Sequence, residues 1–275
     1  MLLFSELQID RRTIALQGLP DRLNGLKVVQ LSDFHADGFL LTEAQLNATI
    51  VAANQAQADL ILLTGDYVSR NPEPIAQLAP QLARLRSRYG TFACLGNHDL
   101  IYPHAKRDIT AALTAVGIPV LWNEVTYPCG EGLALIGLAD FWHRDFQPGP
   151  VLETVAPTIP RLVMSHNPDS AAVLQQWRVD LQLSGHTHGG QLVLPGIGNL
   201  AAIAARFGGQ LPTNLQKRIP GLRSCLRVVK NWDWVQGYHR VGENQLYVNR
   251  GLGSYPPGRL FCPPEVTVIT LTTAH

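Results

Sequence analysis

The sequence predicts a layered α/β fold in which two mixed β-sheets pack face to face between helices, a four-layer αββα sandwich. Three observations lead to this prediction. Apolar runs alternate with helical segments in the first half of the chain, the second half is rich in short strands, and polar side chains of metal-ligand type follow several apolar runs. Polar groups at the carboxyl ends of strands are where α/β sheets bind their ligands, so the sequence also predicts a site there.

The composition is that of a globular chain and points to no special class. The 275 residues are 46% hydrophobic and carry a formal net charge of +1, which suits a single domain over residues 1–275. This charge gives no indication of nucleic-acid binding, so no nucleic-acid partner is expected. The cysteines lack C-x-x-C spacing, which favours a reducing compartment; they are Cys94, Cys129, Cys225 and Cys262.

The N-terminal run at residues 1–7 is too short an apolar segment for a signal peptide. No stretch approaches the roughly 18 consecutive apolar residues that a membrane-spanning helix needs. We therefore expect a cytoplasmic protein, soluble or in peripheral contact with the inner membrane face. The sequence does not indicate an oligomeric state.

In the first half, the expected strands and helices alternate as in βαβ units. Strands are expected at residues 8–16, 26–31, 59–64 and 90–95. Helices are expected at 42–54, with Thr42 as N-cap, at 74–87, and from Pro103 through Val116. In the second half we expect one helix, at 170–177, and strands at 119–122, 125–127, 133–138, 161–165, 181–184, 236–241, 245–249 and 266–271.

Eight side chains suited to metal binding or proton transfer come at the ends of these strands. Asp33 and His35 are two apart on an extended segment, so they point to the same side, and His186 and His188 share this spacing. Each motif alone has a structural alternative: Ser32 and Asp33 could cap a helix, and residues 96–99 could form a turn. The full set is Asp33, His35, Asp66, Asn97, His98, His166, His186 and His188.

These side chains form a mixed set of nitrogen and oxygen donors. Such a set suits Mn, Fe or Zn better than Ca or Mg, which prefer all-oxygen sites. The set is also too large for one cation with three or four protein ligands. It suits two divalent metal ions that share a bridging carboxylate, as in many phosphoryl-transfer sites. The two ions of such a pair lie about 3.5–4 Å apart.

The order of the motifs resembles the calcineurin-like metallophosphoesterase superfamily. The motifs are D-x-H at 33–35, G-D at 65–66, G-N-H-D at 96–99, a later His166, and G-H-T-H at 185–188. The resemblance implies the metallo-dependent phosphatase fold and two metal sites with Asp66 shared. The implied ligands are Asp33, His35, Asp66 and His188 for one ion, and Asp66, Asn97, His166 and His186 for the other.

The resemblance also implies catalytic roles. His98 matches the residue that serves the family as general acid or stabilises the phosphate, and Asp99 matches its orienting partner. A hydroxide that bridges the two metals would attack phosphorus in line. The implied activity is hydrolysis of a phosphodiester or pyrophosphate bond.

Differences from the motifs of protein phosphatases in this superfamily indicate which branch the sequence resembles. The run at residues 65–71 lacks the second Asp and the final Gly of protein phosphatases. The flanks at 26–35, 185–191, 247–253 and 263–266 instead resemble a bacterial branch that includes membrane-associated phosphodiesterases and UDP-2,3-diacylglucosamine pyrophosphatases of lipid A biosynthesis. A UDP-diacylglucosamine-like lipid is therefore the substrate hypothesis. The alternatives are a phosphodiesterase or phosphatase acting on soluble nucleotides and a non-catalytic metal-binding scaffold.

An insertion at about 191–232 combines basic and apolar residues. It has no Asp or Glu between Gly190 and Trp232, and its cations are Arg206, Lys217, Arg218, Arg223, Arg227 and Lys230. One interpretation is a lid that meets an anionic lipid substrate or a membrane, with Arg223 and Arg227 at the phosphate. The alternative is a solvated helical excursion. Arg250, which precedes Gly251, is a further phosphate candidate; its alternative is a solvated turn residue.

Overall fold

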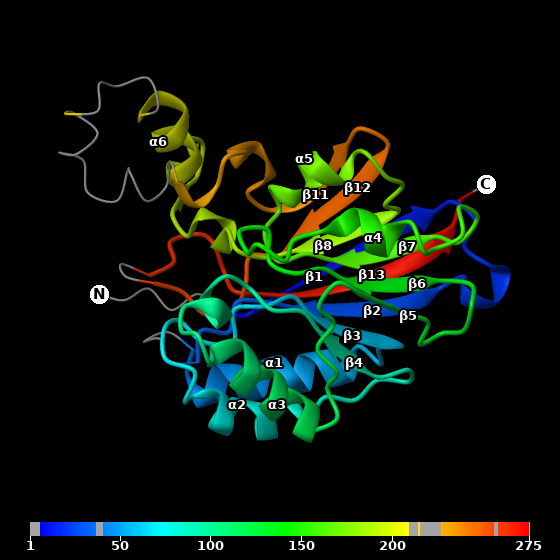
Figure 1. Cartoon of the computed structure of the whole chain (residues 1–275). Helices are drawn as coiled ribbons and strands as arrows, with labels where there is room; N and C mark the ends of the chain where they lie inside the picture. The colour runs from blue at the N-terminus through cyan, green and yellow to red at the C-terminus, as the bar shows by residue number, and fades with distance from the viewer. Residues whose placement is uncertain (1–5, 37–40, 209–213, 215–226, 256–257, 275) are drawn as a thin grey trace.

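Two mixed β-sheets stack face to face in the computed structural model, which describes residues 6–36, 41–208, 214, 227–255 and 258–274 (Figure 1). The first sheet has the strand order β1-β13-β2-β3-β4. Strand β13 runs antiparallel to β2, and the other neighbours in this sheet are parallel. The strands are β1 (Gln8–Leu16), β2 (Leu26–Leu31), β3 (Leu60–Leu63), β4 (Thr91–Ala93) and β13 (Glu265–Thr273).

The second sheet has the order β11-β12-β8-β7-β6-β5. Its central strands β12, β8, β7 and β6 are parallel, and the edge strands β11 and β5 are antiparallel to their neighbours. The strands are β5 (Glu124–Thr126), β6 (Ala134–Gly137), β7 (Arg161–Met164), β8 (Leu181–Ser184), β11 (Gly237–Val241) and β12 (Asn244–Val248).

Helices cover the outer faces of both sheets, as Figure 1 shows. On the first sheet lie α1 (Glu43–Gln55), α2 (Ile75–Leu82) and α3 (Ala105–Ala115). On the second lie α4 (Pro148–Leu152) and α5 (Ser170–Leu174). The predicted four-layer αββα architecture is confirmed. Thr42 caps α1 as expected, because its side chain accepts a hydrogen bond from the Gln45 N–H.

The sheets are held together by side chains that alternate along each strand. In β3, Leu60 and Leu62 pack into the core between the sheets, whereas Ile61 and Leu63 pack against the helices. All four are fully buried. A parallel strand covered on both faces must be apolar throughout, which explains the uninterrupted apolar run in the sequence.

The structure differs from the prediction in a few elements. Residues 119–122 form only an isolated bridge between Val120 and Ala93 in place of the expected strand. Helix α2 ends at Leu82, short of the expected residue 87, and α5 ends at Leu174, short of 177. Helix α4, which begins at Pro148, was not predicted; it has only one turn, too short to show a helical period.

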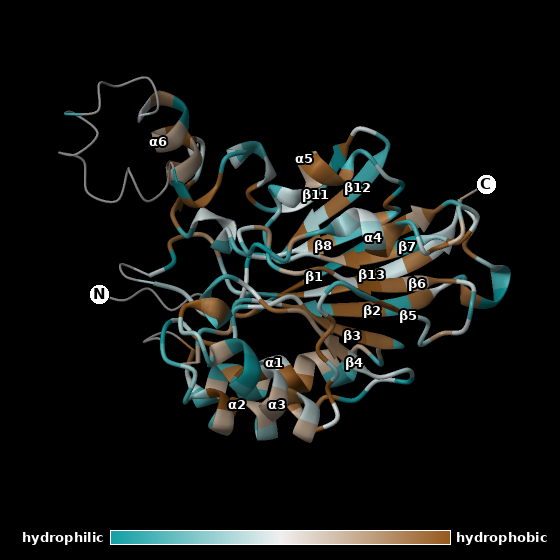
Figure 2. Cartoon of the chain, viewed as in Figure 1, coloured by the Kyte–Doolittle hydropathy of each residue, from teal (hydrophilic) through white to brown (hydrophobic). Residues whose placement is uncertain are grey.

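The described part of the insertion begins with a small hairpin, β9 (Val193–Leu194) and β10 (Gly198–Asn199), which leads into α6 (Leu200–Gly208). Helix α6 lies apart from the two sheets in Figure 1, and Figure 2 shows that much of it is apolar. Ile197 and Phe207 are more than half exposed. Arg223, Lys217 and Arg218 lie outside the described residues. None of the described helices is long and apolar enough to cross a bilayer.

Candidate metal centre

The predicted ligands lie at the carboxyl ends of neighbouring parallel strands. Asp33 follows β2, Asp66 follows β3, Asn97 follows β4, His166 follows β7 and His186 follows β8. Because parallel strands all end at the same edge of a sheet, and the two sheets stack, these ends converge.

Five of the candidate ligands have a left-handed backbone. The φ angles are 52° at Asp33, 46° at His35, 56° at Asp66, 71° at His186 and 51° at His188. This conformation costs a non-glycine residue about 1–3 kcal/mol and persists only where the surroundings impose it. Such strain is concentrated at functional sites. Here it lets the chain turn sharply as each strand ends and direct the side chain toward the centre.

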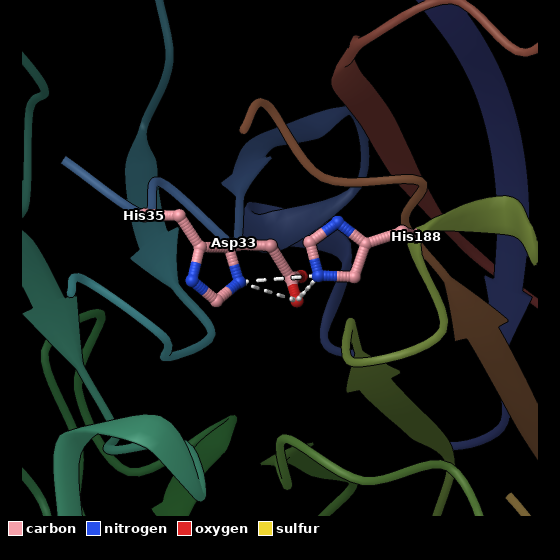
Figure 3. Close-up of side chains that lie close together, drawn as sticks. All are labelled: Asp33, His35 and His188. Carbon is pink, nitrogen blue, oxygen red and sulfur yellow. Dashed lines mark hydrogen bonds and ion pairs between the residues drawn. The ribbon is translucent and has the colours of Figure 1, made fainter. Parts of the chain in front are cut away.

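The first group consists of Asp33, His35 and His188, which point toward one another (Figure 3). Nε2 of His188 lies 3.3 Å from Oδ1 of Asp33, and Nε2 of His35 lies 4.0 Å from the same oxygen. The two Nε2 atoms are 3.1 Å apart. All three side chains are buried, so a carboxylate and two imidazoles share one enclosed space.

The second group consists of Asp66, His166 and His186, whose potential ligand atoms lie within 4.8 Å of one another. Nε2 of His166 lies 3.0 Å from Oδ2 of Asp66. The same Oδ2 lies 3.7 Å from Nε2 of His35, which belongs to the first group. The Asp66 carboxylate therefore stands between the two groups.

Backbone carbonyls orient three of the four imidazoles. Nδ1 of His166 is 2.6 Å from the Thr64 carbonyl oxygen, and Nδ1 of His188 is 3.3 Å from that of Gly253. Nε2 of His186 is 2.9 Å from the carbonyl oxygen of Val228, which belongs to the insertion. A carbonyl only accepts, so each of these nitrogens carries the proton. In the neutral imidazole, the other nitrogen then directs its lone pair inward, as in metal-binding histidines.

Two inward atoms are buried without a hydrogen-bond partner among the described residues. They are Oδ1 of Asn97 and Nδ1 of His186. A buried polar atom left unsatisfied costs about 1–3 kcal/mol, and a bound cation would satisfy both. The residues present therefore fit divalent metal ions, and the mixture of imidazole, carboxylate and amide suits Mn, Fe or Zn.

Asp66 and His166 shift each other's pKa through their close contact. Burial alone would lower the pKa of His166 and raise that of Asp66, but their mutual attraction reverses both effects. The pKa of His166 rises to about 10, and that of Asp66 lies well below its ordinary value. Burial, reinforced by the charge on His166, lowers the pKa of His186 to about 4. A proton shared by Asp66 and His166 therefore competes with a cation.

His98 lies beside the two groups in a short 3₁₀ turn, His98–Leu100. Its Nδ1 is 2.5 Å from the Ser69 carbonyl oxygen, and its Nε2 is 3.1 Å from the hydroxyl of Tyr255. The backbone N–H of His98 donates to Oδ1 of Asp66 at 2.9 Å. The main-chain contact therefore holds His98 close to the Asp66 carboxylate.

Asp99, the expected orienting partner of His98, bonds to the backbone of two neighbouring loops. Its Oδ2 accepts the backbone N–H groups of Asp66 at 2.8 Å and Gly96 at 2.9 Å, and its Oδ1 accepts that of Tyr67 at 2.9 Å. Asp99 therefore joins the loop after β3 to the loop after β4. The described hydrogen bond at Nδ1 of His98 is to the Ser69 carbonyl instead.

Arg250, a phosphate candidate from the sequence, contacts three other residues of the chain. Its Nε lies 3.1 Å from Oε2 of Glu265 and donates to the Pro263 carbonyl, and its Nη2 donates to Gln8. Its ion pair with Glu265 is largely buried, so Arg250 is not the solvated turn residue of the alternative interpretation. Arg227 is exposed, and Arg223 lies outside the described residues.

Sequence reasoning missed three residues near the site. Asp140 follows β6, and its buried Oδ2 has no partner among the described residues; the strand-end rule that found the other ligands could have found it. Arg259 is 7% exposed and donates to the carbonyl oxygens of His188 and Gly253. Tyr255 contacts two histidines of the site. Neither of the latter follows a strand, so no simple pattern marks them.

Comparison with known proteins agrees with this geometry. The family model for calcineurin-like phosphoesterases matches residues 26–190. Phosphodiesterase YaeI of Escherichia coli K12 is 33% identical over 258 residues, which cover 91% of this chain and 84% of that protein. The uncharacterized metallophosphoesterase YkuE of Bacillus subtilis is 28% identical over 276 residues, 98% of this chain and 87% of that protein.

A third relative is the UDP-2,3-diacylglucosamine pyrophosphatase LpxG of Chlamydia muridarum. It is 26% identical over 295 residues, which cover 90% of this chain and 84% of that protein. The family match spans both candidate metal groups, and the relatives cover most of the chain. This chain therefore belongs to the calcineurin-like phosphoesterase family and is a metallophosphoesterase, a hydrolase of phosphate esters.

Proposed function

We propose that this protein hydrolyses a phosphodiester or pyrophosphate bond with two divalent metal ions that share Asp66. The observation that carries this proposal is the position of the Asp66 carboxylate. Its Oδ2 lies 3.0 Å from Nε2 of His166 in one group and 3.7 Å from Nε2 of His35 in the other. One ion would be held by Asp33, His35, Asp66 and His188, and the other by Asp66, Asn97, His166 and His186.

When bound, two such ions lower the pKa of a water molecule and neutralise phosphoryl oxygens. The side chains of the protein would position the substrate and bring a proton to the leaving oxygen. Because Nδ1 of His98 donates to the Ser69 carbonyl, Nε2 is the atom that can bring a proton to the leaving oxygen. Asp99 acts on the same step only indirectly, since it fixes the backbone at Asp66 and Gly96.

Metal analysis combined with a panel of phosphate esters tests this proposal. The purified wild type should contain two equivalents of Mn, Fe or Zn after loading and should hydrolyse a diester. Asp66→Asn should bind fewer ions and lose activity, whereas Asp108→Asn, which changes a partly exposed carboxylate on α3, should change neither. A single ion per chain in the fully active wild type would rule out the shared-carboxylate mechanism.

A lipid-linked pyrophosphate similar to UDP-diacylglucosamine is the substrate class we propose. Two observations support it. Relatives over most of the chain are named UDP-2,3-diacylglucosamine pyrophosphatases. The described part of the insertion exposes the apolar side chains of Ile197 and Phe207 and the cations Arg206, Arg227 and Lys230, and the carbonyl of Val228 in the same insertion touches His186. Apolar and basic side chains together suit an anionic lipid surface.

The competing function is hydrolysis of soluble nucleotides, which the name of the phosphodiesterase relative leaves open. Activity on a lipid-linked UDP-sugar and on its deacylated counterpart separates the two. A kcat/KM at least tenfold higher for the acylated substrate, and dependent on liposomes or detergent, would support the lipid assignment. Equal values would favour the soluble nucleotide. A non-catalytic scaffold is disfavoured because every ligand position and His98 are present.

A further inference from the structure

The hydroxyl of Tyr255 lies among the functional histidines. It is 3.1 Å from Nε2 of His98, 2.9 Å from Nδ1 of His35 and 3.2 Å from Nε2 of His35. The Tyr255 ring also packs edge-on against the His35 ring, with their centroids 4.7 Å apart. A phenol from the loop between β12 and β13 therefore reaches both a candidate metal ligand and the candidate proton donor.

The orientation of His98 places this hydroxyl on the substrate side. The Ser69 carbonyl holds the Nδ1 proton of His98, so only Nε2 faces the reacting phosphate. An oxygen that takes a proton from Nε2 must come within about 2.6–3.2 Å of it. The Tyr255 hydroxyl already lies at that distance. A phosphate oxygen bound beside Nε2 would therefore also lie beside the phenol, whose O–H is a neutral hydrogen-bond donor.

The loop that carries Tyr255 is fastened on both sides. The N–H of Tyr255 donates to Oε1 of Gln191 at 2.8 Å, and the N–H of Gly253 donates to the Asp33 carbonyl at 2.7 Å. The buried guanidinium of Arg259 binds the carbonyl oxygens of Gly251 at 3.1 Å and Gly253 at 2.6 Å. A donor held in advance by such contacts stabilises a charged transition state without reorganisation.

The two arginines near this loop are engaged elsewhere and do not act as hydrogen-bond donors beside His98. Arg250 is paired with Glu265, and Arg259 is committed to backbone carbonyls. The donor that the loop does bring to His98 is the phenol of Tyr255.

We propose that Tyr255 is a further catalytic residue, whose hydroxyl donates a hydrogen bond to an oxygen of the phosphate bound beside His98. This assignment rests on the proposed phosphohydrolase function. On substrate binding the phenol turns its hydrogen bond from the histidines to the phosphate oxygen. No covalent bond to the tyrosine forms or breaks.

The variant Tyr255→Phe in the full-length, metal-loaded protein tests the proposal. It removes one oxygen and keeps the ring against His35. We expect kcat/KM for a diester to fall about 100-fold, at the lower end of the range seen when a single transition-state donor is lost. The inhibition constant for inorganic phosphate should rise about tenfold, and metal content should stay unchanged. Tyr238→Phe is the matched control, because the Tyr238 phenol bonds only to Gln245 among the described residues; it should behave as wild type.

The outcomes separate this proposal from the proposed function. Wild-type kinetics and wild-type phosphate inhibition in Tyr255→Phe would overturn the role of Tyr255 and leave the hydrolase intact. A loss of bound metal that parallels the loss of activity would also overturn it, because the phenol would then only position His35. If the wild type hydrolysed no ester, the proposed function would fail; phosphate binding by the metal-loaded wild type and Tyr255→Phe would still decide whether the phenol contacts phosphate.

Discussion

Nε2 of His166 lies 3.0 Å from Oδ2 of Asp66, and this contact raises the pKa of His166 to about 10. In the metal-free protein at pH 7 the imidazole is therefore protonated. A cation needs the neutral imidazole, so metal binding must release this proton, and its apparent affinity should rise with pH up to about 10. The slope is about tenfold per pH unit for one proton. Below pH 6 the affinity should fall further, because burial raises the pKa of Asp33 to about 6.

Calorimetry at pH 8 in buffers of different ionisation enthalpy measures this proton directly. We expect about one proton released as the second group binds its cation. His166→Ala should bind more weakly and release none. His186 serves as a comparison, because its pKa of about 4 means that it is already neutral at pH 8. An equal proton count in wild type and His166→Ala would contradict the assignment.

Asp99→Asn should lower the free energy of unfolding while leaving kcat nearly unchanged. The two oxygens of Asp99 accept three backbone N–H groups, from Asp66, Tyr67 and Gly96. An amide keeps only one acceptor oxygen, so at least one buried N–H loses its partner, at about 1–3 kcal/mol for each. Urea unfolding in the presence of a chelator should show a loss of about 2 kcal/mol. Asp108→Asn, which changes a partly exposed carboxylate on α3, should stay within about 0.5 kcal/mol of wild type.

The same variant distinguishes the structural role of Asp99 from the orienting role expected from the sequence. If Asp99 acted through the His98 imidazole, Asp99→Asn would lower kcat at unchanged stability. The structure gives the opposite order, because the His98 imidazole is held by Ser69.

The exposed side chains of α6 should govern contact with anionic membranes. Phe207→Ser combined with Arg206→Glu removes an exposed aromatic side chain and reverses one charge. A buried Phe contributes about 1.5–3 kcal/mol to partitioning, and each cation near an anionic surface about 1 kcal/mol. Binding to phosphatidylglycerol liposomes should therefore weaken at least tenfold. Val51→Ser with Arg86→Glu makes the same kinds of change at exposed positions outside the insertion and should leave liposome binding intact; equal loss in both pairs would point to net charge alone.

The sequence could predict those site residues that directly follow a regular strand. Asp33, Asp66, His166 and His186 each follow an apolar run that forms a parallel strand, and strand ends of this kind meet at one sheet edge. The contacts of Arg250 and Tyr255 could not be predicted from the sequence. Arg250 pairs with Glu265, fifteen residues away on β13, and Tyr255 lies on an irregular loop whose path depends on Arg259 and Gln191. Such paths follow from long-range contacts and leave no periodic pattern.

His98→Ala should reveal whether this imidazole delivers a proton. A general acid contributes about 10²- to 10⁴-fold to the rate, and it matters most when the leaving group is a poor one. We therefore expect kcat for an alkyl diester or pyrophosphate to fall by about this factor, and kcat for a 4-nitrophenyl ester to fall much less, because nitrophenolate leaves without a proton.

Metal content in His98→Ala should match wild type, since the imidazole contacts Ser69 and Tyr255 and belongs to neither candidate metal group. His104→Ala, on an exposed histidine just before α3, is the matched control and should retain full activity on both substrates. An equal fall for good and poor leaving groups in His98→Ala would mean that the imidazole stabilises the phosphate without protonating the departing oxygen. In that case Nε2 of His98 and the hydroxyl of Tyr255, 3.1 Å apart, would share one task, and the double variant would lose less than the product of the two single losses.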